Sequence, residues 1–280
     1  RTISSAASDV YKRQAINNFL KRFFPAGFYY KTFMWPKSFW YKVYEPFIRK
    51  AAGLGVASLE KDKERYEHKF EYCDLLVTGS GPSGLASAYA AAKNGAKVIL
   101  AEDKPRYGGT LLTDDVSIDN MSGKDWSEKI ISELKTMPNV ILKNRSQVFG
   151  YYDHNMMVMF ERVGDHLSNK SKYTPRQRLW YIRAKETILS TGSIERPIVF
   201  GNNDTPGVVL SSAAKEYMKV YGVLVGRKPI IFTNNDSAYE TAFEFKKNNV
   251  EPIILDTREE HDSEVCLLYT SDAADEIVRV

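Results

Sequence analysis

The residues with the clearest chemical role are three glycines spaced as G-x-G-x-x-G: Gly79, Gly81 and Gly84. This spacing is typical of a turn that holds the pyrophosphate of a dinucleotide at the start of a helix. Gly79 would make the tight turn, Gly81 would leave room for the pyrophosphate, and Gly84 would let the helix pack closely on a sheet. Pro82 and Ser83 would begin that helix, whose N–H groups and dipole favour phosphate.

A carboxylate follows where such a site would meet a ribose. Glu102 lies 23 residues after Gly79. A carboxylate there can accept hydrogen bonds from both ribose hydroxyls and would repel a 2′-phosphate. The sequence therefore favours NAD or FAD over NADP.

Residues after Glu102 could complete the site. The Gly108-Gly109 pair would let the backbone approach a ligand along the sheet edge. Lys104 and Arg106 could touch the adenosine or its phosphates, although solvent-facing loop charges are an equal alternative. Val148 is placed where its backbone groups could pair with adenine.

The elements around the glycines are those that position such a site. We expect a buried strand at Leu75–Val77, an alanine-rich helix that ends at Asn94-Gly95, and a second strand at Lys97–Ala101. An isolated motif would fit an ordinary glycine turn as well. The strand, the helix, the second strand and the terminal acid together favour the dinucleotide site.

The chain beyond this unit reads as further helices and strands, with a β-rich meander between them. We expect helices at Trp126–Met137 and Ser211–Tyr221 and strands at Val140–Leu142, Ser146–Tyr152, Asn155–Val163, Arg178–Ala184 and Glu186–Gly192.

A second strand–turn–helix–strand unit follows, but its turn carries no glycines. The strands are expected at Pro229–Thr233 and Pro252–Asp256, with a helix at Ser237–Asn248. Side chains of Asn234–Ser237 would block close approach of a phosphate, and Asp236 would repel it. We expect this unit to bind no dinucleotide in the usual way.

The segment Ala15–Glu60 is rich in aromatic residues and is interrupted throughout by lysines and arginines. Pro25, Pro36 and Pro46 divide it, so an irregular arm with one or two short helices is expected, packed on this domain or on another subunit. A helix on a membrane surface is a weaker alternative, since the basic residues do not gather on one face. Glu60–Glu71 reads as a charged, solvated linker.

Both ends read as DNA-library sequence rather than protein. Ser4–Gln14 can be encoded by an oligonucleotide whose reverse complement, read one base in, encodes Cys266–Asp275. This oligonucleotide resembles a sequencing adapter. The expected organisation is an adapter-derived segment over 1–14, an aromatic arm and linker over 15–71, a NAD/FAD-type dinucleotide-binding domain with a meander over 72–200, an incomplete second dinucleotide-type domain over 201–264, and an adapter-derived segment over 265–280. The core is expected to be an internal fragment of a longer protein.

Composition excludes several classes of function. Cys73 is the one cysteine outside the adapter-like ends, which excludes a disulfide framework, a C-x-x-C redox pair and a cysteine metal site within the core. The net charge of +4 argues for neither nucleic acid nor membrane. His154 and His166 lack carboxylate or cysteine partners at metal spacing, so no metal site is expected. The basic loop between Lys170 and Arg178 is expected to be solvated, with a docking role as the alternative.

Five stretches carry a family resemblance: AGFYYKTFMWPKSFWYKVYEPFIRKAAGLG, VTGSGPSGLA, AEDKPRYGGTLL, STGSIERPIVFGNNDTPGV and IIFTNNDSAYETA. Together they resemble the alpha subunits of heterotetrameric sarcosine oxidase. The resemblance implies a truncated α/β chain with a Rossmann-like FAD/NAD(P)-binding, two-dinucleotide-domain fold of the thioredoxin-reductase type. It also implies a cytoplasmic complex with beta, gamma and delta subunits, without nucleic acid or membrane.

The same resemblance implies chemistry and a set of site residues. Enzymes of this family oxidise sarcosine to glycine, form H2O2, and pass the methyl carbon to tetrahydrofolate or formaldehyde. The substrate-oxidising FAD is in the beta subunit, FMN lies between alpha and beta, and NAD is associated with alpha. The residues that match the family's NAD contacts are Gly79, Gly81, Pro82, Ser83, Gly84, Glu102, Asp103, Lys104, Gly109, Thr110 and Val148.

No residue in the chain is a convincing acid, base or nucleophile, so a scaffold role is expected rather than a catalytic one. One alternative is an FAD-binding subunit of an opine or amino-acid dehydrogenase, or a pyridine-nucleotide-disulfide-type oxidoreductase. The missing C-x-x-C and the missing second glycine turn count against an autonomous reductase. Another alternative is an interaction module that uses the aromatic arm and retains no nucleotide.

Overall fold

A computed structural model describes residues 33, 35–53, 58–258 and 277–279. The chain divides into two compact units, Arg1–Lys63 and Glu64–Val280. In the first unit, the described residues form η2 (Trp40–Tyr44) and α3 (Glu45–Ala51), as expected for short helices in an irregular arm. The predictions for 1–14 and for 15–32 lie outside the described residues.

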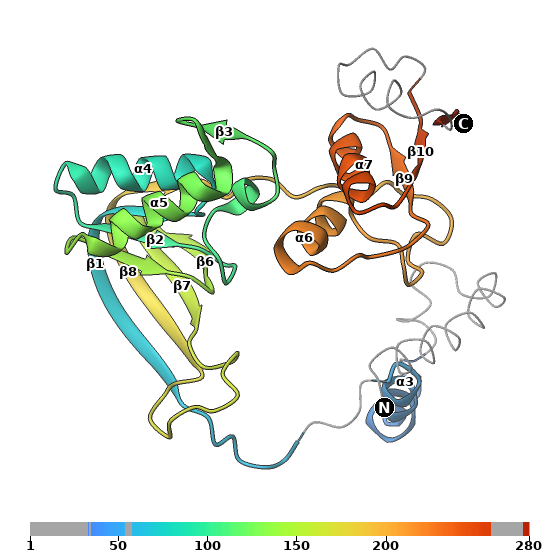
Figure 1. Ribbon diagram of the computed structural model, residues 1–280. Helices are drawn as coiled ribbons and strands as arrows, with labels where there is room; N and C mark the ends of the chain where they lie inside the picture. The colour runs from blue at the N-terminus through green and yellow to red at the C-terminus, as the bar shows by residue number, and fades with distance from the viewer. Residues whose placement is uncertain (1–32, 34, 54–57, 259–276, 280) are drawn as a thin grey trace. The chain divides into compact units, whose positions relative to one another are not determined.

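The second unit is built on a mixed sheet of six strands in the order β5-β2-β1-β8-β7-β6 (Figure 1). The strands are β1 (Tyr66–Thr78), β2 (Val98–Ala101), β5 (Val140–Lys143), β6 (Ser146–Tyr152), β7 (Met156–Arg162) and β8 (Gln177–Leu189). The neighbours β5, β2, β1 and β8 pair in parallel, whereas β7 pairs antiparallel with both β8 and β6.

Two helices, α4 (Pro82–Lys93) and α5 (Gly123–Thr136), lie together over one face of this sheet (Figure 1). Leu75 and Val77 of β1 join Leu85 and Ala88 of α4 in a buried cluster that also includes the apolar residues of α5. The other face of β1 and β2 packs against the meander strands, through Leu76, Ile99, Met159 and Trp180 among others. The second half of β1 and the whole of β2 are therefore buried on both faces, as their continuous apolar runs predict.

The structure corrects two of the expected boundaries. Tyr66–Glu71, read as part of a solvated linker, is the first half of β1 and pairs with β8 along its whole length. The high charge of this stretch hid its alternating aromatic residues, and Phe70, 79% exposed, stacks on Tyr181 with ring centroids 5.0 Å apart. The strands expected at Arg178–Ala184 and Glu186–Gly192 are one continuous strand, β8, because β1 pairs with both halves.

Short elements fill the connections of the first sheet. They are η3 (Gly109–Leu112), β3 (Ser117–Ile118), β4 (Met121–Ser122) and η4 (Asp153–Asn155). The basic loop after β7 is held by ion pairs within its own unit: Lys170 pairs with Glu64, and Arg176 pairs with Asp165 at 2.6 Å. These pairs bind two of the loop's basic residues to acids of the same unit, and the alternative of a docking role stays untested.

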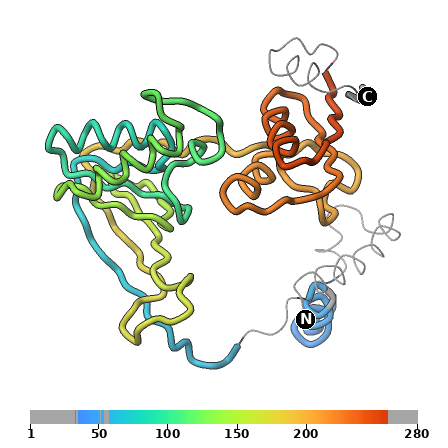
Figure 2. Tube along the Cα trace, viewed as in Figure 1, coloured from blue at the N-terminus to red at the C-terminus, as the bar shows by residue number. Residues whose placement is uncertain are grey.

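After β8 the chain runs without helix or strand through residues 190–210 and enters α6 (Ser211–Tyr221), as Figure 2 shows. A second parallel sheet follows, in the order β11-β10-β9, with α7 (Ser237–Lys247) between β9 (Ile230–Thr233) and β10 (Ile253–Asp256). The third strand, β11 (Ile277–Arg279), falls in the segment predicted as adapter-derived. Its pairing does not test that origin.

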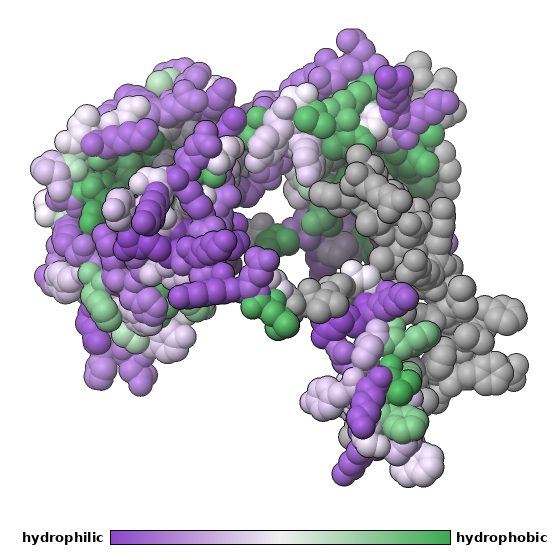
Figure 3. Space-filling model, turned by 90° about the horizontal axis from the view of Figure 1, so that it is seen from below, coloured by the Kyte–Doolittle hydropathy of each residue, from purple (hydrophilic) through white to green (hydrophobic). Residues whose placement is uncertain are grey.

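The face of the molecule drawn in Figure 3 carries both hydrophilic and hydrophobic residues. In Figure 3, hydrophilic residues cover most of the left-hand part of the face drawn, and hydrophobic residues show as smaller groups between them. None of the helices within the described residues combines the length and the apolar character that crossing a bilayer requires.

Candidate functional site

The glycine turn connects β1 to α4, and two of its glycines are required by packing. Gly79 has a φ of +97°, and a Cβ there would lie 2.1 Å from the carbonyl oxygen of Ser190, the residue directly after β8. A Cβ on Gly84 would lie 2.0 Å from the carbonyl oxygen of Gly79. Any larger residue at either position must displace backbone, so these two glycines bring α4 and β8 close to the turn.

Gly81 differs from the other two, because a Cβ there would meet no atom within 4 Å. Its backbone is extended, with φ −67° and ψ −174°, a conformation that any residue can adopt. Packing within the described residues therefore does not require glycine at this position. The open space beside Gly81 is what close approach of a pyrophosphate would require.

The start of α4 is also open to an anion. Gly81 is the N-cap, Pro82 follows in the first turn, and no side chain in the described part of the chain caps the helix. The N–H groups of Ser83 and Gly84 lie in this first turn, where a helix presents unpaired donors and the positive end of its dipole. A phosphate would satisfy those donors.

Glu102 lies directly beyond β2 and beside the glycine turn. It is only 6% exposed. Its carboxylate accepts hydrogen bonds from Ser80 N at 2.9 Å, Ser80 Oγ at 2.5 Å and Lys104 N at 2.9 Å. Burial raises the pKa of this carboxyl group, and a hydrogen bond with Asp103 raises it further, while the Ser80 and Lys104 donors oppose the shift.

These contacts modify the expected ribose contact. A carboxylate offers about four acceptor positions, and three already receive protein donors. One ribose hydroxyl can take the remaining position, and a second requires the Ser80 hydroxyl to rotate away.

The Gly108-Gly109 pair packs against the same turn. Gly108 N donates to both the carbonyl oxygen and the Oγ of Ser80, each at 3.1 Å. Gly109 has a φ of +54°, and a Cβ there would lie 2.9 Å from the Cα of Gly81. The sequence assigned this pair to close approach of a ligand. In the structure the glycines allow close approach of the first turn, and Thr110 follows as an exposed residue of η3.

The remaining predicted residues lie at varying distances from this centre. Ser146 N donates to the carbonyl oxygen of Glu102 at 2.7 Å, which places the start of the edge strand β6, and so Val148, close to the end of β2. Asp103 is exposed, and its carbonyl oxygen accepts from Arg162. Lys104 contributes its backbone N–H to Glu102.

The charged ends of Lys104 and Arg106 lie against α6. Lys104 Nζ pairs with Glu216 at 2.7 Å, and Arg106 donates to the carbonyl oxygen of Val220 at 3.2 Å. In the structure these two side chains contact α6, and their expected contacts with adenosine or phosphate stay a prediction.

Sequence reasoning missed Ser80. This residue is fully buried and joins the three parts of the site, since it donates to Glu102 and accepts from Gly108. The glycine motif treats its position as variable, so spacing gave no signal. A small hydroxyl residue between two glycines, followed 22 residues later by an acid, is the pattern that could have indicated it.

The second strand–turn–helix–strand unit fills the corresponding place with side chains. Asn235 Oδ1 accepts from Ser237 N at 3.0 Å and from Ser237 Oγ at 2.5 Å, which occupies the start of α7. Asp236 pairs with Arg258 at 2.7 Å, and Arg258 also pairs with the buried Asp256 at the end of β10. This geometry agrees with the expectation that the glycine-free turn blocks a phosphate.

Among the described residues, no group of three or more His, Cys, Asp or Glu side chains could hold a metal ion. Cys73 is buried, and burial raises the pKa of its thiol to about 12, so it is not a nucleophile at neutral pH.

Comparisons with known proteins extend this geometry. Residues 74–149, which contain the glycine turn, Glu102 and Val148, match the family model of FAD dependent oxidoreductases. The alpha subunit of sarcosine oxidase from Rhizobium meliloti (strain 1021) is 47% identical over 245 residues, which is 87% of this chain. The chain is homologous to sarcosine oxidase alpha subunits. A second such protein, from Corynebacterium sp. (strain U-96), is 37% identical over 210 residues, or 74% of this chain.

The chain spans about a quarter of the length of these relatives, 25% and 22% respectively. An opine oxidase subunit from Agrobacterium tumefaciens (strain Ach5) is more distant, at 27% identity over 58% of this chain and 33% of its own length. The resemblance carried by the five sequence stretches is thus confirmed.

Solved structures confirm the fold class. The L-proline dehydrogenase of P. horikoshii superposes with a TM-score of 0.57 and 23% identity, over 74% of this chain and 40% of its own. The thioredoxin reductase of T. acidophilum has a TM-score of 0.52 and 11% identity, over 74% of this chain and 64% of its own. At these identities the likeness shows the fold alone.

Proposed function

We propose that this chain is the NAD-binding part of a sarcosine-oxidase-type alpha subunit, with the nucleotide held between the start of α4 and Glu102. The observation that carries the proposal is the contrast among the glycines: packing requires Gly79 and Gly84, whereas Gly81 borders open space at an uncapped helix start. Nothing in the described fold would clash with a Cβ at residue 81. A bound ligand is therefore the best explanation for glycine at this position.

The residues proposed to hold the nucleotide fall into two groups. Gly79, Gly81, Pro82, Ser83 and Gly84 would surround the pyrophosphate, with the α4 N–H groups as donors. Glu102, Asp103, Lys104, Gly109, Thr110 and Val148 would border the ribose and adenine, with the Glu102 carboxylate and the backbone of Lys104 and Val148 as the contacting groups.

Glu102 supports NAD over NADP. A 2′-phosphate would bring negative charge against a carboxylate that is already buried, and burial strengthens that repulsion. FAD is the second candidate, because the family model that matches residues 74–149 describes FAD dependent oxidoreductases. Both nucleotides carry the same adenosine and pyrophosphate, so the contacts above serve either one.

We propose a supporting role for this part in an oxidoreductase complex, in line with the names of its relatives. A bound NAD would supply a hydride acceptor, while the chain's own residues bind and orient it. For the whole protein we propose oxidation of sarcosine, with transfer of the methyl carbon to tetrahydrofolate or formaldehyde. We also propose FAD in a beta subunit, FMN at the interface with that beta subunit, gamma and delta subunits as further partners, and a cytoplasmic location.

The test is the identity of the nucleotide that the chain retains and binds. The purified chain is denatured, the released nucleotide is identified by mass and visible absorbance, and NAD, FAD and NADP are then titrated by calorimetry. We expect NAD to bind and NADP to bind much more weakly. Retention of a flavin would favour the FAD candidate. Binding of no nucleotide would favour the interaction module and refute the proposal.

A matched pair of variants tests the location. Gly81→Val places a branched side chain in the open space at the helix start, and Gly226→Val does the same at another glycine where a Cβ meets no atom within 4 Å. Both should keep the melting temperature of the unmodified chain. Only Gly81→Val should lose nucleotide binding, and equal affinities in the two variants would place the site elsewhere.

A further inference from the structure

The loop that follows Gly109 is held at both of its ends. At one end, Gly108 and Gly109 pack on Ser80 and Gly81 of the glycine turn. The carbonyl oxygen of Thr110 then accepts from Thr113 N at 2.9 Å and from Asp114 N at 2.8 Å, which turns the chain sharply. The position of Thr110 beside the proposed site therefore depends on where Asp114 is held.

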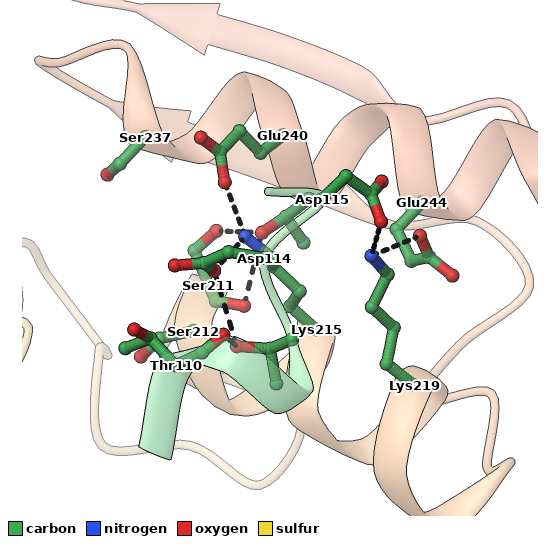
Figure 4. Close-up of polar contacts among 12 residues, drawn as sticks. Thr110, Asp114, Asp115, Ser211, Ser212, Lys215, Lys219, Ser237, Glu240 and Glu244 are labelled. Atoms are coloured by element: carbon green, nitrogen blue, oxygen red, sulfur yellow. Dashed lines mark hydrogen bonds and ion pairs between the residues drawn. The ribbon is translucent and has the colours of Figure 1, made fainter. Parts of the chain in front are cut away.

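Asp114 is held by a lysine of α6, the helix that precedes the second strand–turn–helix–strand unit. Lys215 donates to Asp114 Oδ1 at 2.8 Å and also pairs with Glu240 on α7. Figure 4 shows the Lys215 ammonium between these two carboxylates. Its side chain is only 10% exposed, so one buried ammonium joins the loop to two helices.

The neighbouring residue reinforces this connection. Asp115 pairs with Lys219 of α6, which also lies 3.7 Å from Glu244 (Figure 4). Asp115 also pairs with Lys247 of α7 at 2.6 Å. Two consecutive acids of the loop thus contact three lysines on two helices. We refer to Asp114, Asp115, Lys215, Lys219, Glu240, Glu244 and Lys247 as the Lys215 cluster.

Within the Lys215 cluster, Lys215 has the most buried lysine side chain, at 10% exposed. Burial lowers the pKa of Lys215, but its hydrogen bonds to Asp114 and Glu240 outweigh that effect and raise it, so the ammonium stays charged. Removing one partner of a buried ion pair leaves the other charge uncompensated, whereas exposed pairs contribute little. The exposed pair of Lys104 with Glu216 also links the first domain to α6, but its lysine side chain is 49% exposed.

We propose that Lys215 is a positioning residue for the nucleotide site, acting through Asp114 to hold residues 108–115 against the glycine turn. The helices α6 and α7, next to a turn that Asn235 fills, then serve the first site by fixing the loop that borders it. The effect of Lys215 on NAD binding rests on the proposed function, whereas the effect of Lys215 on the loop does not.

The experiment compares three variants of the full chain with the unmodified chain. Lys215→Met removes the ammonium and keeps much of the side-chain length, and Lys215→Arg restores the charge. Lys246→Met is the matched control, because Lys246 is another lysine with a largely buried side chain and its ion pair with Glu251 lies within the second strand–turn–helix–strand unit. Hydrogen–deuterium exchange without nucleotide measures the loop, and calorimetric titration of NAD measures the site.

In Lys215→Met we expect faster exchange in residues 108–115 and a Kd for NAD raised on the order of 10-fold, the size of a typical coupling between sites. Lys215→Arg should restore most of the protection, and Lys246→Met should change neither quantity. Asp114→Asn should weaken binding similarly, and adding it to Lys215→Met should weaken binding little further, because both changes break one interaction.

The outcomes separate this inference from the proposed function. Unchanged exchange of residues 108–115 in Lys215→Met would overturn the inference, whatever NAD does. Exchange that rises equally in residues 230–256 would also overturn it, because Lys215 would then only stabilise the helices and strands around it. If the unmodified chain binds no NAD, the proposed function fails, and a local rise in residues 108–115 still supports the positioning role.

Discussion

Two glycines of the same turn should respond to alanine in opposite ways. A Cβ on Gly84 would lie 2.0 Å from the carbonyl oxygen of Gly79 and 3.3 Å from the Cβ of Ser190, so backbone must move. Helix propensity alone would favour alanine there by about 1 kcal/mol, whereas forced overpacking costs roughly 1–3 kcal/mol and occasionally more. Because the nearest atom is backbone and lies at 2.0 Å, the overpacking cost should reach about 3 kcal/mol. Subtracting about 1 kcal/mol of helix propensity leaves a net loss of about 2 kcal/mol for Gly84→Ala.

For a domain of this size, that loss lowers the melting temperature by roughly 4–8 °C. Gly81→Ala is the control, since its Cβ meets nothing within 4 Å and its φ is −67°. It should be neutral or raise stability by about 0.4–1 kcal/mol, because alanine restricts the unfolded chain. Scanning calorimetry of both variants without nucleotide is the assay. Equal melting temperatures for the two would refute the assignment of Gly84 to packing and Gly81 to ligand space.

Three further predictions concern single side chains. Glu102→Ala should weaken NAD binding by about 1–3 kcal/mol, since a charged acceptor of a ribose hydroxyl is lost; calorimetric titration measures this, and unchanged affinity would contradict the ribose contact. Asn235→Ala should cost about 1 kcal/mol in unfolding free energy by leaving the start of α7 without its side-chain acceptor, and chemical denaturation measures it against Asn234→Ala. Hydrogen bonds from Lys219 and Lys247 lower the pKa of Asp115 from 3.8 to about 2. The stability that Asp115 adds relative to Asp115→Asn should therefore be complete above pH 3.8 and disappear as the pH falls through about 2, and a difference that grows on acidification would have the wrong sign.

The local pattern of the sequence predicted most elements well. The expected helix Ser211–Tyr221 and strand Ser146–Tyr152 match α6 and β6 at both ends, and the stop at Asn94-Gly95 matches the end of α4. These segments carry their own signals: apolar periodicity in the helices, alternation in the strand, and a glycine after the last turn. Tertiary contacts agree with those signals and do not override them.

The errors arose where a partner strand decides the structure. Glu67, Lys69 and Glu71 make the start of β1 look like a linker, yet this stretch pairs with β8 residue by residue. Part of the charge is compensated across strands, as in the pair of Arg178 on β8 with Glu67 at 3.0 Å. No property of the stretch alone encodes that partner, so the sequence read in isolation could not predict the strand.

The candidate site shows the same division. The glycine spacing and the terminal acid indicated the turn and Glu102, because their roles depend on local backbone geometry. The side chain of Lys104 was expected at the ligand because Lys104 is near Glu102 in sequence. Nothing in the local sequence indicated that its ammonium would contact Glu216, which lies 112 residues further along the chain. Ser80 was missed for the opposite reason, since its importance comes from contacts with residues 22 and 28 positions away.

The two strand–turn–helix–strand units share one architecture but carry different side chains at the start of the helix and at the end of the second strand. At the first, the helix start has no side-chain cap among the described residues, and the acid that ends the second strand accepts neutral donors from Ser80 and Lys104. At the second, Asn235 occupies the helix start, and the corresponding acid, Asp256, is paired with Arg258. A dinucleotide needs free donors for its phosphates and a free acceptor for its ribose. Of these two units, only the first offers both the donors and the acceptor. The lysines of α6 and α7 that contact Asp114 and Asp115 would therefore support the site of the first unit, because the second unit offers no such site of its own.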